Sequence, residues 1–323
     1  MKKFAVCLGL ILALYSWAAE PGLSVYTGKH PRTGKITLQL IRDVHTVRGT
    51  VLFGKDGVSR DLYGTIRGDS ILIHDPQAGY FVEKPRGLKG VWVDETASLH
   101  LRFRRDRKTG YDLVFLKDTT YMYPGSEESP YMLYSGCATV LPGLNPQGET
   151  VADPFLKVFF DSRNYFAEQA SRTASDYAAL RAASPRPPDG RSFFHYYEDQ
   201  TDILYHDGRY LSLRHRNTSF SGGAHPNTVR RHAVLNLRTG RMLGFEDLFA
   251  ENAEQVIKAL LDKAREKKYP DEILFSRDYH VSRDFYVTKR GVVFQYDPYE
   301  IAPYYIGSIE IFLPYRALRS VLR

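Results

Sequence analysis

Short runs of alternating apolar and polar residues fill the first third of the chain, and they restrict its fold more than any other feature. Between residues 25 and 117 the alternation recurs in segments such as 35–41 and 58–66. A period of two is typical of a β-strand with one buried face. The pair Asp56-Gly57 separates two runs and favours the positive φ angles of a tight hairpin turn. We therefore predict about eight strands without a helix, folded as a small barrel or a sandwich.

After residue 150 the apolar residues recur at helical spacing. The spacing over residues 153–183 predicts one long helix or two joined helices, and the prolines that follow cannot continue it. A second amphipathic helix is predicted from about residue 252 to 268. Between and after the helices we expect a meander of extended segments at 192–206, 209–220 and 230–237, and further strands at 284–288, 291–296 and 308–313. This pattern predicts an antiparallel sheet backed by helices.

The two patterns define a division of the chain. We predict a signal peptide at 1–18, a β-barrel-like domain at 22–118, a linker at 119–150 and an α+β domain at 151–323. The linker is assigned because residues 117–148 are rich in Pro, Gly, Ser and Tyr. The fold class of the whole chain is therefore α+β, with an all-β part first.

The N-terminus has the organisation of a secretory signal. Lys2 and Lys3 precede an apolar run that ends at residue 14, and Ser16 and Ala18 occupy the −3 and −1 positions of a cleavage site. Cys7 lies too early in the run to be the acylated residue of a lipoprotein. We expect a periplasmic or secreted protein with no transmembrane segment after cleavage, because no later run approaches the length that a spanning helix needs.

The sequence contains no template of a familiar catalytic class. It has no Gly-x-Ser-x-Gly elbow, no His-Glu-x-x-His pair and no Gly-x-Gly-x-x-Gly loop. The histidines lack metal-ligand spacing, and Cys137, the one cysteine left after signal cleavage, can form neither an intramolecular disulfide nor a thiolate zinc site. We expect no metal, no cofactor and a non-catalytic binding protein. A hydrolase that uses Ser221 and His225 is the alternative.

Two segments of the second domain combine conformationally special residues with aromatic and ionisable side chains. Residues 220–227 read FSGGAHPN, and residues 294–307 read FQYDPYEIAPYYIG. Paired glycines permit backbone angles and close approaches that a Cβ blocks. Each segment is either a structural turn or a contact surface, and in the second case the candidate binding residues are His225, Asn227, Tyr299, Glu300 and Tyr304.

Arginines dominate the stretch around the first segment. No acidic residue lies between Asp207 and Glu246, whereas seven arginines do. Residues two apart in a strand share a face, so neighbouring arginines on one strand point the same way. They form either a solvated strand face or a basic surface for an anionic envelope polymer, because guanidinium groups bind phosphates and carboxylates in a fork. The candidate residues of that surface are Arg214, Arg216, Arg230 and Arg231.

Together, FSGGAHPN, FQYDPYEIAPYYIG and the intervening NLRTG and LGFEDLF resemble the RsiV-like domain over roughly residues 190–318. That domain forms the extracellular part of a lysozyme-sensing anti-sigma factor and accompanies the catalytic domain of the peptidoglycan deacetylase PdaC. The resemblance implies an α+β fold and a role in recognising a component of the cell envelope. It does not imply catalysis.

The sequence departs from those relatives at both ends. We expect a cleavable signal with no cytoplasmic segment before it, and no deacetylase domain after Arg323. Transmembrane signalling and deacetylation are therefore not expected. The partners we predict are an envelope glycan, an anionic polymer, or a protein ligand such as a lysozyme. Direct transfer of lysozyme binding is disfavoured by the net charge of +7, because familiar lysozymes are also basic. Nucleic acid is not an expected partner of an exported protein.

Overall fold

The computed structural model describes residues 22–323 except 44, 76–78, 85, 95–96, 108–110, 122–131, 142–143, 145–153 and 184–194. The predicted signal peptide lies outside the described residues. The chain divides into two compact units, one built from the strands up to residue 109 and the other from residue 110 onward together with Lys55–Val58. The fold is α+β, as the sequence predicts. Within the described residues, no helix is long and apolar enough to cross a membrane.

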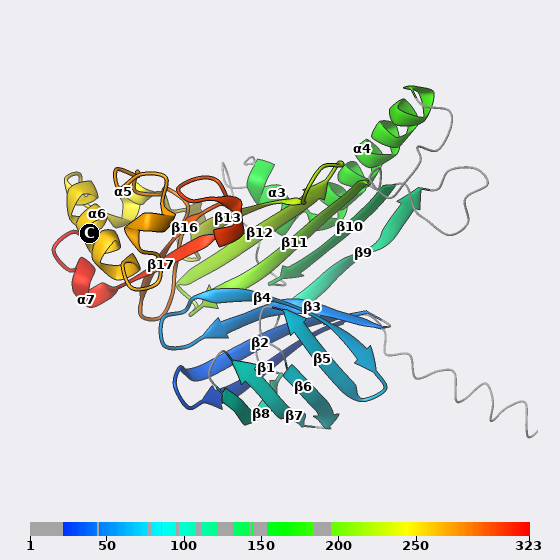
Figure 1. Cartoon of the computed structure of the whole chain (residues 1–323), viewed down its shortest axis with the longest axis horizontal. Helices are drawn as coiled ribbons and strands as arrows, with labels where there is room; N and C mark the ends of the chain where they lie inside the picture. The colour runs from blue at the N-terminus through cyan, green and yellow to red at the C-terminus, as the bar shows by residue number, and fades with distance from the viewer. Residues whose placement is uncertain are drawn as a thin grey trace, which may run out of the picture. The chain divides into compact units, whose positions relative to one another are not determined.

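The first unit is a closed antiparallel barrel and not a sandwich (Figure 1). Each strand pairs with the next, and β1 pairs with β8 to close the ring. The interior is filled by buried side chains that include Tyr26, Leu38, Phe81 and Trp92. Eight strands leave an interior just wide enough for such a core. The strands are β1 (Gly22–His30), β2 (Gly34–Arg42), β3 (Thr46–Phe53), β4 (Ser59–Arg67), β5 (Ser70–Asp75), β6 (Gly79–Lys84), β7 (Gly87–Asp94) and β8 (Ala97–Asp106).

The second unit contains a six-stranded sheet in the order β14-β13-β12-β11-β10-β9. Its strands are β9 (Asp112–Tyr121), β10 (Met132–Val140), β11 (His195–His206), β12 (Tyr210–Phe220), β13 (Asn227–Asn236) and β14 (Arg241–Met242). The predicted meander corresponds to β11, β12 and β13, which are antiparallel. Strands β10 and β11 are parallel, and the chain between them includes α3 (Pro154–Phe160) and α4 (Ser162–Ala183). The helices pack on the sheet face that carries Leu211 and Leu213.

Strand β10 lies inside the range 119–150, where the sequence predicts a linker. This strand lies between β9 and β11 in the sheet and pairs with both. The prediction of a linker for this part of the chain is therefore corrected. Tyr134, Ser135, Gly136 and Cys137 are all buried, so both faces of the strand are covered and no alternation of apolar and polar residues marks it.

A three-stranded antiparallel sheet completes the second unit. It consists of β15 (Phe285–Val287), β16 (Gly291–Tyr296) and β17 (Ile309–Pro314), flanked by α5 (Phe245–Leu248), α6 (Ala253–Arg265), η2 (Asp271–Ile273), η3 (Tyr304–Ile306) and α7 (Tyr315–Leu318). Helix α6 buries Ile257 and Leu261 on one face, as its apolar spacing predicts. The Ser212 hydroxyl donates to the Val287 carbonyl over 2.8 Å, which joins β12 to β15. The small sheet thus covers the face of the large sheet opposite α3 and α4.

Candidate functional site

The two sequence segments singled out above lie together in the structure, although 74 residues separate His225 from Tyr299. The His225 imidazole stacks on the Tyr304 ring with the ring centroids 3.6 Å apart and the planes 14° from parallel. The Tyr304 hydroxyl donates to the Pro226 carbonyl over 2.8 Å. A stacked pair and a hydrogen bond therefore fix the glycine-rich turn between β12 and β13 against the loop that precedes β17.

The hydrogen bonds of His225 define its tautomer. Its Nδ1 lies 3.1 Å from the Pro226 carbonyl oxygen, which can only accept. Nδ1 therefore carries the proton, and in the neutral ring Nε2 accepts from the Tyr299 hydroxyl over 3.3 Å. Among the residues that the structure describes, no carboxylate is hydrogen-bonded to this histidine. The arrangement orients an aromatic surface and lacks the His–carboxylate couple of a general base.

Tyr299 has an unusual backbone conformation, with a φ of +70°. This region costs an L-residue roughly 1–2 kcal/mol, and glycine escapes most of that cost. The turn is held by hydrogen bonds from the Tyr299 N–H to the Ala302 carbonyl and from the Asp297 N–H to Glu300 Oε2. Strain that the surroundings hold in place is characteristic of functional positions. Here it sets the direction of an exposed tyrosine ring.

Glu300 is hydrogen-bonded to His280 and not to His225. Its Oε1 lies 2.9 Å from Nε2 of His280, an exposed histidine that the sequence analysis did not select. His280 was missed because it lies outside both segments, and only the folded chain brings it beside Glu300. The pair adds a polar, solvent-accessible edge to the aromatic surface.

Asp297 anchors the loop to the large sheet. Its carboxylate accepts the Arg230 backbone N–H over 3.1 Å and the Gln295 side-chain amide over 3.0 Å. Burial raises the pKa of Asp297, while the Arg230 N–H and guanidinium act in the opposite direction. The Arg230 side chain reaches Ser308 on the far side of the loop. Arg230 is therefore a structural link between β13 and the loop.

These exposed side chains and the half-buried Tyr304 define a surface that we call the tyrosine face. It consists of His225, Asn227, Tyr299, Glu300, Tyr304 and Tyr305. Tyr299 is 57% exposed and Tyr305 is 78% exposed, values that are high for such large rings. Tyr305 lies within the second segment but was not among the predicted binding residues. Five of the nine predicted site residues thus come together here.

Residues 246–316 match the family model of DUF3298. Its description is "Protein of unknown function". The matched range carries Tyr299, Glu300, Tyr304 and Tyr305, whereas the glycine-rich turn with His225 precedes it. The tyrosine face therefore combines residues of the matched range with a turn from the preceding sheet.

Two solved structures of DUF3298 proteins are similar to this chain. One, from Bacteroides fragilis NCTC 9343, has 17% sequence identity and a TM-score of 0.48, and the alignment covers 66% of this chain and 93% of the other. The second, from Pseudomonas aeruginosa PAO1, has 16% identity and a TM-score of 0.44, with 65% and 94% covered. No curated protein matches the chain.

Two predicted binding residues, Arg214 and Arg216, are buried at 1% exposure. Arg214 donates from Nε and Nη2 to Asp202, and Arg216 donates to the Gln200 amide oxygen. The prediction that they contribute to an exposed face is wrong, because the small sheet packs over this side of β12. Their partners are acidic and polar residues of the neighbouring strand β11, which the sequence does not show to be adjacent.

Arg230 and Arg231 are adjacent on β13 and so point to opposite faces. Arg230 belongs to the loop anchor, and Arg231 is exposed on the side of α3 and α4. The four predicted arginines therefore do not form one surface. Within the described parts of the chain, no group of three or more His, Cys, Asp or Glu side chains is arranged to hold a metal ion.

We expect Tyr299→Gly to be more stable than Tyr299→Ala by about 1 kcal/mol, because both remove the ring and only glycine relieves the cost of the positive φ. Urea unfolding of the two variants measures the difference. At Tyr305, where φ is not positive, the order should reverse, since alanine is the better residue in a helical turn. If Tyr299→Ala is as stable as Tyr299→Gly or more stable, the positive φ does not strain this position.

Proposed function

We propose that the chain is an exported, non-catalytic protein that binds a glycan of the cell envelope through the tyrosine face. The observation that carries the proposal is the convergence of two exposed tyrosines and a stacked His–Tyr pair from segments far apart in sequence. Tyrosine offers a rigid apolar ring with a polar tip. A sugar ring presents apolar C–H faces and peripheral hydroxyls, so it matches such side chains in shape and polarity.

The polar groups around the rings suit a ligand rich in hydroxyls. Asn227 and Glu300 are exposed, and their amide and carboxylate groups accept or donate to hydroxyls. The exposed His280 imidazole is hydrogen-bonded to Glu300, so one carboxylate oxygen of this edge is already engaged. Arg214 and Arg216 are buried, which removes the main support for an anionic polymer. A neutral polysaccharide is the ligand class that these groups fit best.

The resemblance to the RsiV-like domain supports envelope recognition and also names a protein ligand, lysozyme. The same tyrosine face would serve that ligand, because tyrosine is enriched at protein-binding hot spots. The glycan proposal and the lysozyme alternative are separated by measuring both ligands on the same variants.

The test is sedimentation of the purified chain, without residues 1–18, on isolated peptidoglycan. We expect saturable binding that is insensitive to salt and that falls about tenfold or more in Tyr305→Ser and Tyr299→Ser, as for hot-spot aromatics. Tyr80→Ser is the matched control, because Tyr80 is a comparably exposed tyrosine of the barrel. An equal loss of peptidoglycan binding in Tyr80→Ser would show that the glycan contacts the barrel and not the tyrosine face. Binding to lysozyme alone, or to neither ligand, would overturn the glycan proposal.

A further inference from the structure

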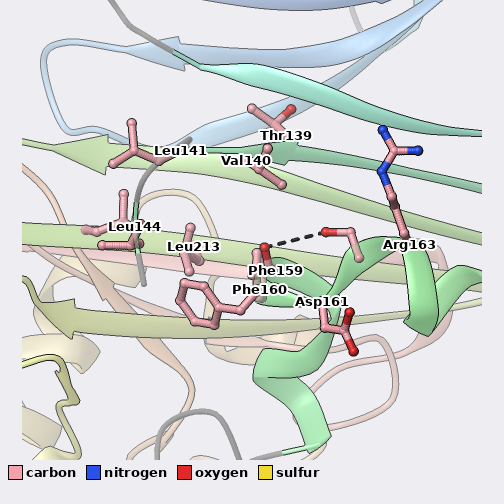
Figure 2. Close-up of a pocket in the computed structure, with 11 residues that line it drawn as sticks. Thr139, Val140, Leu141, Leu144, Phe159, Phe160, Asp161, Arg163 and Leu213 are labelled. Carbon is pink, nitrogen blue, oxygen red and sulfur yellow. Dashed lines mark hydrogen bonds between the residues drawn. The ribbon is translucent and has the colours of Figure 1, made fainter. Parts of the chain in front are cut away.

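Described residues on the helix-covered face of the six-stranded sheet line two cavities that are separate from the tyrosine face. The first has a volume of about 290 Å³, and its lining includes Leu141, Leu144 and Leu213 beside the α3–α4 corner. Figure 2 shows these side chains with Phe160 around the space. Most of this lining is apolar. The second cavity differs in chemistry.

The second cavity has a volume of about 320 Å³ and is formed by helices α3 and α4 and strands β12 and β13. Phe155 and Val229 provide apolar walls. Tyr165, His215, Asn217 and Arg231 provide polar groups. The volume lies at the lower end of the range of small-molecule sites, which combine apolar walls with a few converging polar groups.

A buried carboxylate holds the polar wall of this cavity in place. Asp199 is 2% exposed, and its Oδ1 lies 2.7 Å from Nε2 of His215. The carboxylate also accepts the Asn217 amide over 3.0 Å and the Tyr134 and Tyr165 hydroxyls over 3.1 and 3.4 Å. Because an ionised carboxylate only accepts, Nε2 carries a proton. The Nδ1 atom of His215 is the ring nitrogen that Asp199 does not engage.

The imidazole is also fixed by aromatic contacts. The Phe155 ring lies 6.2 Å from it at 36°, and the Tyr165 ring lies 5.9 Å away in an edge-to-face contact. A ring held by one short hydrogen bond and two aromatic neighbours needs little reorganisation to receive a ligand. This polar wall is therefore preorganised.

One cationic side chain lines the cavity, and a second acts on one of its lining residues. Arg231 lines it, is exposed and forms no ion pair with any described residue. Burial and Asp199 raise the pKa of Tyr165, while Arg172 and Arg231 act in the opposite direction, which places both guanidinium groups in the electrostatic range of that phenol. The buried carboxylate of Asp199 is already engaged by four donors. The outer part of the cavity is therefore suited to an anion.

We propose that this cavity binds a small organic carboxylate with an apolar body. Arg231 receives the carboxylate, because a guanidinium fork matches its two oxygens. Phe155 and Val229 contact the apolar body, and the Asp199-held His215 forms the polar wall. This site lies on the opposite side of β13 from Arg230 and is independent of the tyrosine face.

The test is calorimetric titration of the purified chain with phenylacetate and with its neutral analogue phenylacetamide. We expect saturable phenylacetate binding that weakens tenfold or more in Arg231→Gln, in line with a charge-assisted hydrogen bond of about 1.5–3 kcal/mol. Phenylacetamide should bind at least tenfold more weakly than phenylacetate, and inorganic phosphate, which lacks an apolar body, should not compete. His215→Gln should also weaken binding.

Arg230→Gln is the matched control, since it removes the same charge from the adjacent residue on the opposite face. Circular dichroism and unfolding midpoints verify that each variant is folded, and the exposed position of Arg231 makes its variant the decisive one. Equal affinity for phenylacetate and phenylacetamide, equal loss in Arg230→Gln and Arg231→Gln, or absence of saturable phenylacetate binding would each overturn the proposal. Efficient competition by inorganic phosphate would show that the site binds anions without needing an apolar body. That result would overturn the proposal as well.

Discussion

Arg214→Ala is expected to lower the free energy of unfolding of the second unit by about 3–5 kcal/mol, the typical cost of removing one partner of a buried ion pair. Arg214 and Asp202 are each 1% exposed, and two N–H groups of the guanidinium donate to Asp202 Oδ2 over 3.2 and 2.7 Å. Without Arg214, the Asp202 carboxylate keeps the Gln200 amide as a neutral donor but loses its buried counter-charge.

Urea unfolding followed by circular dichroism measures this cost. Arg231→Ala removes the same side chain from an exposed position and should change the free energy by no more than about 0.5 kcal/mol. The double variant Arg214→Met/Asp202→Leu should recover most of the loss, because it removes both charges together. A single Arg214→Ala variant within about 1 kcal/mol of the unsubstituted protein would show that Asp202 finds other compensation.

Trp92→Ala is expected to destabilise the barrel by about 3–5 kcal/mol, as for large aromatic residues truncated in a core. Trp92 is 1% exposed inside the barrel and lies 6.1 Å from the Phe81 ring, which in turn contacts Phe103 edge-to-face at 5.7 Å. A closed barrel of eight strands cannot contract around the missing ring, because its hydrogen-bonded circumference fixes the interior width. The cavity therefore remains.

Val93→Ala is the control, since Val93 is the next residue of β7 and is 38% exposed on the outside of the barrel. It should change the unfolding free energy by about 0.5 kcal/mol or less. The far-ultraviolet signal serves as the probe, because Trp92 is the only tryptophan after residue 17 and its removal eliminates tryptophan fluorescence. Equal destabilisation by the two substitutions would contradict the assignment of Trp92 to a packed interior.

Much of the fold follows from local pattern. The barrel strands alternate with a period of two, and the pairs Asp56-Gly57 and Asp207-Gly208 mark chain reversals between neighbouring strands. The spacing of Ile257 and Leu261 predicts α6. These features are set by residues a few positions apart. Strand β10 escapes prediction because burial on both faces removes the alternation that identifies other strands.

The candidate site could be predicted only in its parts. His225, Tyr299 and Tyr304 were selected because glycines and prolines shape their segments, but their contact depends on how the small sheet packs on the large one. The errors at Arg214 and Arg216 have the same origin, since their polar partners lie on β11 at positions fixed by strand register. The His215–Asp199 contact likewise joins residues of two strands. Register is a long-range property that residue spacing does not encode.

The closure of the barrel has a consequence for association between copies of the chain. Because β1 pairs with both β2 and β8, the described strands form a closed ring in which each strand has a neighbour on both sides, and a closed ring is not easily extended by strand addition. The six-stranded sheet is open, and its two ends differ. Strand β14 forms one end and has two residues, so it offers few backbone groups for pairing with another strand. Strand β9 forms the other end and has ten residues. Within the six-stranded sheet, β9 is therefore the longer template for edge-to-edge pairing with another chain.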